Sequence, residues 1–428
     1  MTDTAVPSPG HAPSAATLAR RRRRYAADRR LRAYGIIAIT FALGLLATLV
    51  ASLLVSGYPA FTQTFVRVDF PISEDLVDPA DPAEGNFRKI MQEGVSTLIP
   101  GEHSPRELRA MAGILTNNTQ FLLRDAVVAD PSVIGGTLTM KVPVSDPFDQ
   151  LNKGLVDRNT PEDRRRLNDT EIGWFDALAD EGRVSRSFNW GLFTHADSRF
   201  PEMAGLKGAI VGSFYALLVC FLISFPVGIA AAVYLEEFAP KNRATDIIEV
   251  NINNLAAVPS IVFGLLGLAV FIQIFGLPRS APLVGGMVLS LMTLPTIIIV
   301  TRNALKAVPP SIREAGYGVG ASQHQVTMHH VLPLAMPGIM TGTIIGLAQA
   351  LGETAPLLLV GMNAFITSPP GGLLDASTAL PTQIFIWADS PERGFVSRTS
   401  AAIIVLLGFL IVMNAIAIFL RQRLERTW

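Results

Sequence analysis

The sequence predicts an all-α polytopic membrane protein of six transmembrane helices, with a small α+β domain inserted between the first two. Of its 428 residues, 50% are hydrophobic and only 16% are charged, and the mean hydropathy is +0.39, values typical of membrane proteins. Six apolar stretches are each long enough to cross a hydrocarbon core of about 30 Å as a helix of about 20 residues. The one cysteine, Cys220, excludes an intrachain disulfide and a zinc site built on thiolates.

The first apolar stretch, 35–66, is best centred on 36–55 and follows a run of arginines. It is too long for a cleaved secretory signal, so we expect an uncleaved anchor. The other stretches are 208–235, 250–278, 280–301, 331–374 and 399–420. In the fifth, which contains the single acid Glu353, we predict a helix over 335–362 followed by a loop rich in proline and glycine.

Basic residues predict the topology, because Lys and Arg collect in short loops on the cytoplasmic side. They flank the stretches at Arg20, Arg21, Arg22, Arg23, Arg24, Lys241, Arg243, Arg302, Lys306, Arg313, Arg421, Arg423 and Arg426. Both termini are therefore expected inside. Since topology already explains the arginine run, a nucleic-acid partner is disfavoured. The predicted divisions are a cytoplasmic basic segment (1–34), the first helix (35–57), an extracytoplasmic domain (58–205) and a five-helix core (206–428).

The extracytoplasmic region is acidic: residues 57–205 hold 15 Lys and Arg against 23 Asp and Glu, a net charge of −8. Long loops are translocated largely regardless of their charge. Its carboxylates have no spacing typical of a metal site or of acid/base catalysis, so we expect neither. Because the chain enters and leaves this region beside two spans, we expect the domain to be removable by joining Ser56 to Gly205.

Helix and strand signals indicate that this region folds as an α+β domain. Ser104 with Glu107 has the spacing of a capping box, and Thr160 with Asp163 gives a second helix start. Alternation of apolar residues over 137–144 predicts a strand, and 184–193 is a second candidate.

Small residues and prolines in the spans predict close helix packing around a path. Gly338, Gly342 and Gly346 recur every four residues, which lets a neighbouring backbone approach one helix face. Prolines are expected to interrupt four spans, at Pro226, Pro259, Pro295 and Pro356. Broken backbone at membrane depth is tolerated beside a polar cavity, so the pattern favours a transporter.

The loop 307–335 between the fourth and fifth spans is too polar to cross the membrane. Ser311 with Glu314 and Ser322 with Gln325 predict two short helices, each opened by a capping box. Glycines between them permit a tight bend: Gly316, Gly318 and Gly320. We call this segment the coupling loop, for the reason given next.

The coupling loop resembles the EAA loop of bacterial ABC importer permeases, which docks into the ATP-hydrolysing subunit. The resemblance rests on Glu314, Ala315, Gly320, Leu332 and Pro333, whereas Gly316 stands where a second alanine is common and His330 where isoleucine is usual. The segments 234–240 (YLEEFAP), 257–264 (AVPSIVFG) and 352–358 (GETAPLL) are similar to the A-type permease of phosphate-specific (Pst) importers. From residue 205 onward the chain is thus identified as a member of this family.

The resemblance implies a permease subunit of the bacterial inner membrane that imports inorganic phosphate. Its implied partners are a second, C-type permease, two copies of an ABC ATPase and a periplasmic phosphate-binding protein. No G-x-x-x-x-G-K-[ST] motif occurs, so ATP and Mg²⁺ would be bound by the ATPase, and this chain would have no cofactor and no catalytic site. A permease for sulfate or phosphonate is an alternative, as is a membrane-anchored sensor or scaffold.

Four residues are candidates for the translocation path. Glu353 is the one acid deep in a predicted span, where burying a charge is costly, and we expect it to form a gate or a helix–helix hydrogen bond with Gln349 or Thr354 nearby. Related sequences often carry an arginine where Gln349 stands. Arg302, at the inner end of the fourth span, either attracts the exiting anion or anchors the helix inside, and anchoring is favoured.

Overall fold

The computed structural model describes residues 15–98 and 104–424, and these form two compact units that divide between Val55 and Ser56. The first unit is carried by α1 (Ala15–Gly57), which continues from the arginine run through the first apolar stretch without a break. A segment of 39 residues, Arg23–Phe61, is long and apolar enough to cross a membrane, as predicted. Residues 1–14 of the predicted basic segment, and Arg426, lie outside the described residues.

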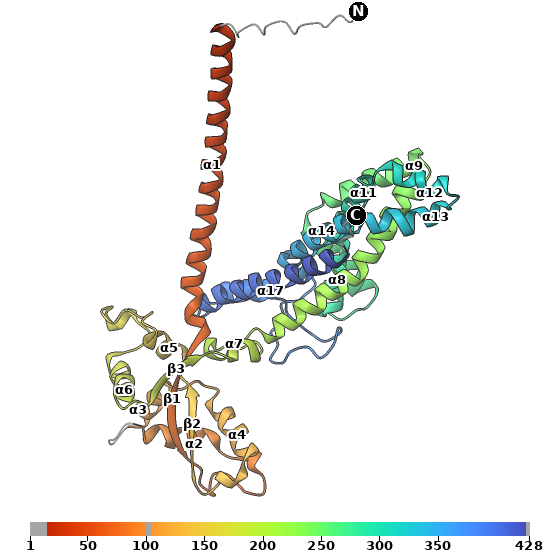
Figure 1. Cartoon of the computed structure of the whole chain (residues 1–428). Coiled ribbons are helices and arrows are strands. Elements are labelled where there is room, and N and C mark those ends of the chain that lie inside the picture. Colours follow the sequence, from red (N-terminus) through yellow and green to blue (C-terminus); the bar gives the residue numbers. More distant parts are fainter. Residues whose placement is uncertain (1–14, 99–103, 425–428) are drawn as a thin grey trace, which may run out of the picture. The chain divides into compact units, whose positions relative to one another are not determined.

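The second unit begins with a three-stranded antiparallel sheet of order β2-β1-β3 (Figure 1). The strands are β1 (Thr62–Pro71), β2 (Thr137–Pro143) and β3 (Val184–Phe188). Val66 of the central strand pairs with Val142 on one side and with Val184 on the other. Both strands expected from alternation are therefore present. The central strand was not predicted, although Val66, Val68 and Phe70 alternate and are fully buried.

Helices pack against this sheet around one hydrophobic core that includes Val66, Phe70, Ile90, Leu123 and Phe175. They are α2 (Phe87–Ser96), α3 (Pro105–Ala112), α4 (Thr119–Ala129), α5 (Asp146–Asn152) and α6 (Asp169–Asp180). The short helix α7 (Gly191–Thr194) instead places Leu192 in a second core with Trp387. This confirms an α+β domain in the sequence before the second span.

The two predicted helix starts in this domain have different outcomes. The capping box of Ser104 and Glu107 opens α3, as predicted. The predicted start at Thr160 is wrong, because the chain there forms only a 3₁₀ turn, Glu162–Arg164. Helix α6 begins nine residues later, where Asn168 and Glu171 satisfy each other's backbone amides.

Four long helices in this unit are apolar enough to span a membrane, and one bent pair supplies a further candidate. The long helices are α8 (Lys207–Val233), α11 (Pro282–Lys306), α14 (Leu332–Gly352) and α17 (Gly394–Leu424). The bent pair is α9 (Arg243–Ala256) with α10 (Ser260–Gly267), which a π-helical segment extends to Ile274. With α1, the described residues hold five to six spans, and this confirms a polytopic helical protein.

Helix breaks occur at two of the four expected prolines. The pair α9 and α10 bends by 99° where Pro259 separates them. Pro356 lies in α15 (Ala355–Leu359), which follows the end of α14. The expectation for Pro226 and Pro295 is wrong, since α8 and α11 continue through them. Both prolines lie in long helices that pack against each other, so neighbouring contacts hold the helical path.

The predicted single helix over 335–362 is also wrong. Helix α14 starts at Leu332 and stops at Gly352, where Glu353 leaves helical geometry with ψ of 123°. After α15 the chain forms an irregular segment and then the short helix α16 (Leu380–Ala388) before α17. The carbonyl of Met362 in this irregular segment accepts a hydrogen bond from the Thr382 hydroxyl at 2.6 Å, which ties it to α16.

Small residues bring α8, α11 and α14 into close contact. A Cβ atom added to Gly286 of α11 would lie 2.5 Å from the Ala216 carbonyl oxygen of α8. On α14, Gly338 faces Ala304 of α11, and Gly342 faces Val300 one turn along. Gly346 is buried, as Gly342 is, but α11 approaches it less closely. An added Cβ at Gly346 would lie 3.9 Å from the nearest atom of α11. Helix α11 is thus the central helix of the group.

Replacing Gly342 with leucine should destabilise the helical core. The new side chain would overlap Val300, and overpacking of this kind costs about 1–3 kcal/mol. A Gly408→Leu variant is the matched control, since a Cβ there meets nothing within 4 Å. We expect a lower thermal midpoint in detergent for Gly342→Leu only. Equal midpoints for the two variants would contradict the packing argument.

Candidate functional site

The coupling loop forms a helix, a glycine turn and a second helix that continues into a membrane span. The first helix is α12 (Pro310–Gly318), Gly320 has φ of 85° in the left-handed region that favours glycine, and α13 (Gln323–Val326) follows. A π-helical turn, Thr327–Val331, joins α13 to α14. The second helix is therefore the beginning of a 30-residue segment, Gln323–Gly352, rather than a separate element.

Only one of the two predicted caps is present in this loop. Ser322 and Gln325 form a capping box at the start of α13, as predicted. The cap at Ser311 is wrong, because Pro310 already occupies the first helical position and Pro309 precedes it as the N-cap. Glu314 then lies in the second turn, and the N-cap residue Pro309 has no N–H for its carboxylate to accept from.

The coupling loop exposes part of its predicted docking residues. Glu314 and Ala315 are exposed, and so are the apolar neighbours Tyr317 at 47% and Val319 at 85%. Exposed apolar side chains beside charged ones are typical of a protein-binding surface.

Other predicted docking residues are buried or partly buried. Gly316 is buried, and a Cβ there would lie 2.8 Å from Val326, so α12 and α13 approach too closely for alanine at this position. Leu332 and Pro333 are partly buried at the start of α14.

An acidic turn at the end of α8 joins the surrounding helices through ion pairs. Glu236 lies in the π-helical turn Tyr234–Phe238. Its carboxylate is 3.3 Å from Arg302 Nε and 3.6 Å from Lys306 Nζ, both on α11. Arg302 also contacts Glu249 of α9 at 2.9 Å. Arg302 thus has two carboxylate partners, which leaves little uncompensated positive charge for attracting an anion.

The next residue, Glu237, connects the same turn to the coupling loop. Its carboxylate accepts a hydrogen bond from Arg313 Nη2 of α12 at 2.7 Å. Arg313 also donates to the carbonyls of Leu305 and Val308, at 3.0 and 2.9 Å. The backbone carbonyl of Glu237 accepts from the Gln323 side chain of α13. Both helices of the loop are therefore attached to the end of α8.

Sequence reasoning missed this network. Glu236 and Glu237 were noted only as part of the segment 234–240, Arg313 only as a positive charge, and Arg302 as a helix anchor or a path residue. The available signal was charge balance, because three acids and three bases lie near the ends of three predicted spans. Their pairing depends on contacts between residues 53 to 76 positions apart, which no local pattern specifies.

Three of the four candidate path residues lie at the break between α14 and α15. Gln349 is exposed on the last turn of α14, and Glu353 and Thr354 are half-buried in the break itself. Within the described residues, no hydrogen bond joins their side chains to one another. Arg302 lies apart from them, in the last turns of α11 with the acidic turn. The structure therefore places three of the four candidates at one break.

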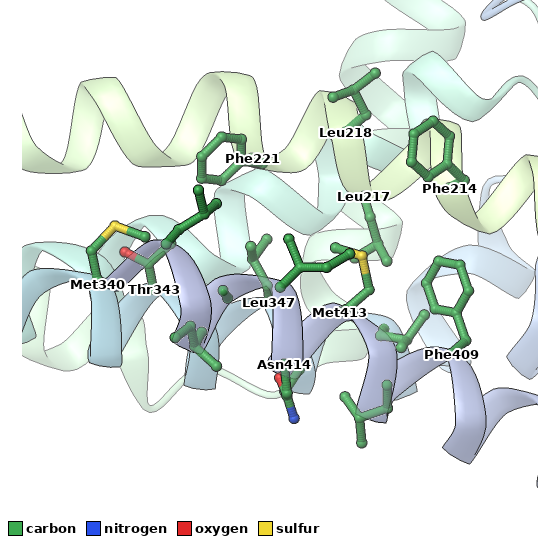
Figure 2. A pocket seen from close by; sticks show the side chains of 17 residues that line it. Phe214, Leu217, Leu218, Phe221, Met340, Thr343, Leu347, Phe409, Met413 and Asn414 are labelled. Atoms are coloured by element: carbon green, nitrogen blue, oxygen red, sulfur yellow. The ribbon is translucent and has the colours of Figure 1, made fainter. Parts of the chain in front are cut away.

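A cavity of about 200 Å³ lies among α8, α14 and α17 (Figure 2). Its lining is almost wholly apolar, with Phe221, Leu347 and Phe409 in view and Thr343 and Asn414 as polar members. Water or an anion would gain few hydrogen bonds there, and burying an unpaired charge is costly. The cavity is therefore unsuited to an anionic cargo.

A buried arginine joins α17 to the α+β domain. Arg398 is only 5% exposed, and its guanidinium donates to the carbonyl of Ala204 at 2.5 Å. The carboxyls of Asp146, Asp149 and Glu202 are its electrostatic partners. Lys153 pairs with Asp149 inside the same cluster. A buried charge with several opposite charges is strongly destabilised when those partners are removed.

Two carboxyls of this cluster are held in an environment that favours protonation. Burial raises the pKa of Asp146, against the opposing effect of a hydrogen bond from Gln150. Burial likewise raises the pKa of Glu202, whose carboxyl accepts a hydrogen bond from the Thr116 hydroxyl at 2.8 Å. Desolvation disfavours the charged form of each group, and nearby cations offset this only in part.

The expectation that the domain can be removed between Ser56 and Gly205 is contradicted by these contacts. Ala60, Leu192 and Ala204 pack in one core with Trp387 of α16 and Phe395 of α17. Trp387 also donates its indole N–H to Asp197 at 3.0 Å. The proposed cut would remove this packing and the partners of Arg398 together, so the two parts fold as one unit.

The chain resembles known protein families in two separate regions. Residues 224–427 match a family described as "binding-protein-dependent transport system inner membrane component", and residues 18–162 match a domain of unknown function, DUF3333. The probable ABC transporter permease protein YqgI of Bacillus subtilis is 32% identical over 199 residues, which are 46% of this chain and 65% of YqgI.

Two further relatives are described as phosphate transport system permeases. PstA 2 of Mycobacterium tuberculosis is 33% identical over 254 residues, which are 58% of this chain and 82% of the relative. PstA of Haemophilus influenzae is 30% identical over 224 residues, which are 52% of this chain and 78% of the relative.

Replacing Glu237 with glutamine should loosen the coupling loop. The change removes a charge-assisted hydrogen bond worth roughly 1.5–3 kcal/mol, so α12 should open locally at least about tenfold more often. Deuterium uptake by residues 310–320 would measure this opening. Asp246→Asn is the matched control, since Asp246 is an exposed acid on α9. Equal uptake in the two variants would show that the ion pair does not hold the loop.

Protonation of Asp146 and Glu202 should stabilise the attachment of the α+β domain to α17. Because both pKa values are raised on folding, the folded state keeps protons that the unfolded chain releases above the ordinary values of 3.8 and 4.5. This contribution is therefore full at low pH and is lost as the pH rises toward the folded-state values. A double variant, Asp146→Asn with Glu202→Gln, should lack the dependence.

Thermal midpoints measured from pH 4 to pH 7 would test this sign. The wild-type midpoint should fall relative to that of the double variant as the pH rises. Asp75→Asn with Asp180→Asn, two exposed acids on the same domain, is the control and should follow the wild type. A wild-type midpoint that rises relative to the double variant would reverse the assignment.

Proposed function

Because the chain belongs to the family of binding-protein-dependent transport system inner membrane components, the permease subunits of bacterial ABC importers, we propose that its cargo is inorganic phosphate. It is a multi-pass membrane protein of this family. The observation that carries the cargo assignment is the similarity to relatives described as phosphate transport permeases, at 30–33% identity over 78–82% of their lengths. A permease for sulfate or phosphonate is the alternative within the same class.

The coupling loop is the docking site for an ATPase in this proposal. Glu314, Ala315, Tyr317 and Val319 are exposed on α12 and the turn after it, and ion pairs fix the loop to the end of α8. A rigid attachment is what mechanical coupling needs, because a displacement of the loop then moves the spans. Gly320 supplies the bend, and Leu332 with Pro333 joins the loop to α14.

The proposed assembly contains this chain, a C-type permease, two copies of an ABC ATPase and a periplasmic phosphate-binding protein. ATP and Mg²⁺ bind to the ATPase, since this sequence contains no P-loop motif. The chain has no cofactor and no catalytic site of its own in this proposal. Among the described residues, no group of three or more His, Cys, Asp or Glu has the arrangement of a metal site.

The break between α14 and α15 is the proposed gate. Unwound backbone at membrane depth frees amide and carbonyl groups, and these groups commonly line a substrate path. Gln349, Glu353 and Thr354 lie at this break, and Gln349 is exposed. Arg302, paired with two carboxylates, anchors α11 and does not bind the cargo. The stripe of Gly338, Gly342 and Gly346 keeps α14 against α11.

The topology proposed for the chain has both termini in the cytoplasm and the α+β domain in the periplasm. Basic residues next to the spans support it, including Lys241, Arg243 and Lys306. In this topology the chain divides after residues 34, 57 and 205 into the basic segment, the first helix, the α+β domain and the helical core. The domain packs on α16 and α17. A role for the domain in docking the loaded binding protein fits its net charge of −8. A sensor or scaffold role is the alternative.

Replacing Glu314 with lysine should abolish ATP-driven phosphate uptake without affecting membrane insertion. Glu314 is exposed on α12 and has no ion pair within the described residues, so its loss costs the fold little. Uptake of radioactive phosphate and ATP hydrolysis by the reconstituted complex would be measured together. Glu84→Lys, on an exposed turn of the α+β domain, is the control with the same charge change. Wild-type uptake by Glu314→Lys would rule out the docking role.

Cargo identity needs its own measurement. Competition of unlabelled phosphate, sulfate and phosphonate against radioactive phosphate uptake would rank the oxyanions. Strong competition by phosphate alone supports the proposal, and preferential uptake of sulfate or phosphonate would replace it. Failure to co-purify with any ATPase would favour the scaffold alternative.

A further inference from the structure

The acidic α+β domain contains a cavity with a basic lining. It has a volume of about 240 Å³ and lies where the turn Glu162–Arg164 and the residues after it approach the segment before α17. Arg164, Arg165 and Arg166 line it from one side, and Arg393, more than 220 positions later in the sequence, lines it as well. Three arginines of a domain whose net charge is −8 and one arginine from the segment before α17 therefore line the same cavity.

The acids near these arginines compensate them only in part. Asp157 is the one acid in the lining, and its carboxylate already accepts a hydrogen bond from the backbone N–H of Asn159 at 2.9 Å. Asp163 is 3.9 Å from Arg164, and both side chains are about three-quarters exposed, so this pair contributes little. Asp146 is 3.7 Å from Arg166. Within the described residues Arg393 has no ion pair.

Arg165 is the most buried of the four arginines. Its side chain is 7% exposed, and it pairs with Asp169 and donates to the carbonyl of Arg158. Its Nε atom is buried without a hydrogen-bond partner and has no accessible surface. A ligand in the cavity would therefore contact the exposed side chains of Arg164, Arg166 and Arg393.

The chemistry of the lining selects the kind of ligand. A cavity lined by four arginines favours an anion, because an anion offsets the repulsion between neighbouring positive charges. Guanidinium groups bind phosphate oxygens in pairs. A carboxylate presents two oxygens on one side, whereas a tetrahedral oxyanion presents acceptors in several directions and can contact arginines from separate segments together.

We infer that this cavity is a binding site for a phosphate group, formed by Arg164, Arg165, Arg166 and Arg393. Free inorganic phosphate would supply this group, and so would the headgroup of an anionic phospholipid, since Arg393 directly precedes the apolar helix α17. The site does not depend on the cargo proposed above. A domain with a net charge of −8 would thus still attract anions at one cavity lined by arginines.

The test uses the purified full chain and a double variant, Arg164→Gln with Arg393→Gln. Both side chains are exposed, so the fold should be kept, and thermal midpoints would verify this. Arg88→Gln with Arg124→Gln is the control, because these arginines lie on α2 and α4 away from the cavity and give the same charge change. In the first arm, inorganic phosphate is titrated by calorimetry in a phosphate-free detergent.

In the second arm, native mass spectrometry measures retention of phosphatidylglycerol after release from nanodiscs. We expect the double variant, but not the control, to weaken one of the two ligands at least about tenfold, because two charge-assisted contacts are lost. An effect on inorganic phosphate identifies a free anion, and an effect on phosphatidylglycerol identifies a lipid headgroup. If the double variant and the control behave alike in both arms, the inference is overturned. Neither arm involves ATP or uptake, so failed phosphate transport would leave this result unaffected.

Discussion

The attachment of the coupling loop to the end of α8 is the interaction on which the functional interpretation depends. Arg313 places a charge on α12 that Glu237 satisfies, while Glu236 does the same for Arg302 and Lys306 of α11. Charges near an apolar helix group cannot remain unpaired at low cost. Pairing them across α8, α11 and α12 therefore makes the loop part of the bundle, and a force applied to its exposed surface can reach the spans.

A second cluster of charges attaches the α+β domain to the helical core. Arg398 of α17 is surrounded by Asp146, Asp149 and Glu202 and donates to the carbonyl of Ala204. Together with the apolar packing of Trp387 and Phe395, this makes the α+β domain continuous with the helical core. The domain and the helical core therefore share one packed interior across residues from both parts.

Local signals in the sequence predicted well whatever depends on near neighbours. The spans follow from runs of apolar residues, and the capping boxes of Ser104 with Glu107 and of Ser322 with Gln325 each depend on a spacing of three residues. Errors arose where two local signals competed. Prolines 309 and 310 displaced the cap expected at Ser311, and the box at Asn168 displaced the start expected at Thr160.

The sequence alone determined the membrane class, the approximate spans, the α+β domain and the position of the coupling loop, because hydropathy and capping are properties of contiguous residues. Only the tertiary structure decided which charges pair, since Glu237 and Arg313 lie 76 positions apart and Glu202 lies far from Arg398 in the chain. It also decided where helices break. Helices α8 and α11 continue through Pro226 and Pro295 because they pack against each other, whereas the chain bends at Pro259. The free energy of a kink or a buried charge depends on what packs around it, and folding alone brings those neighbours together.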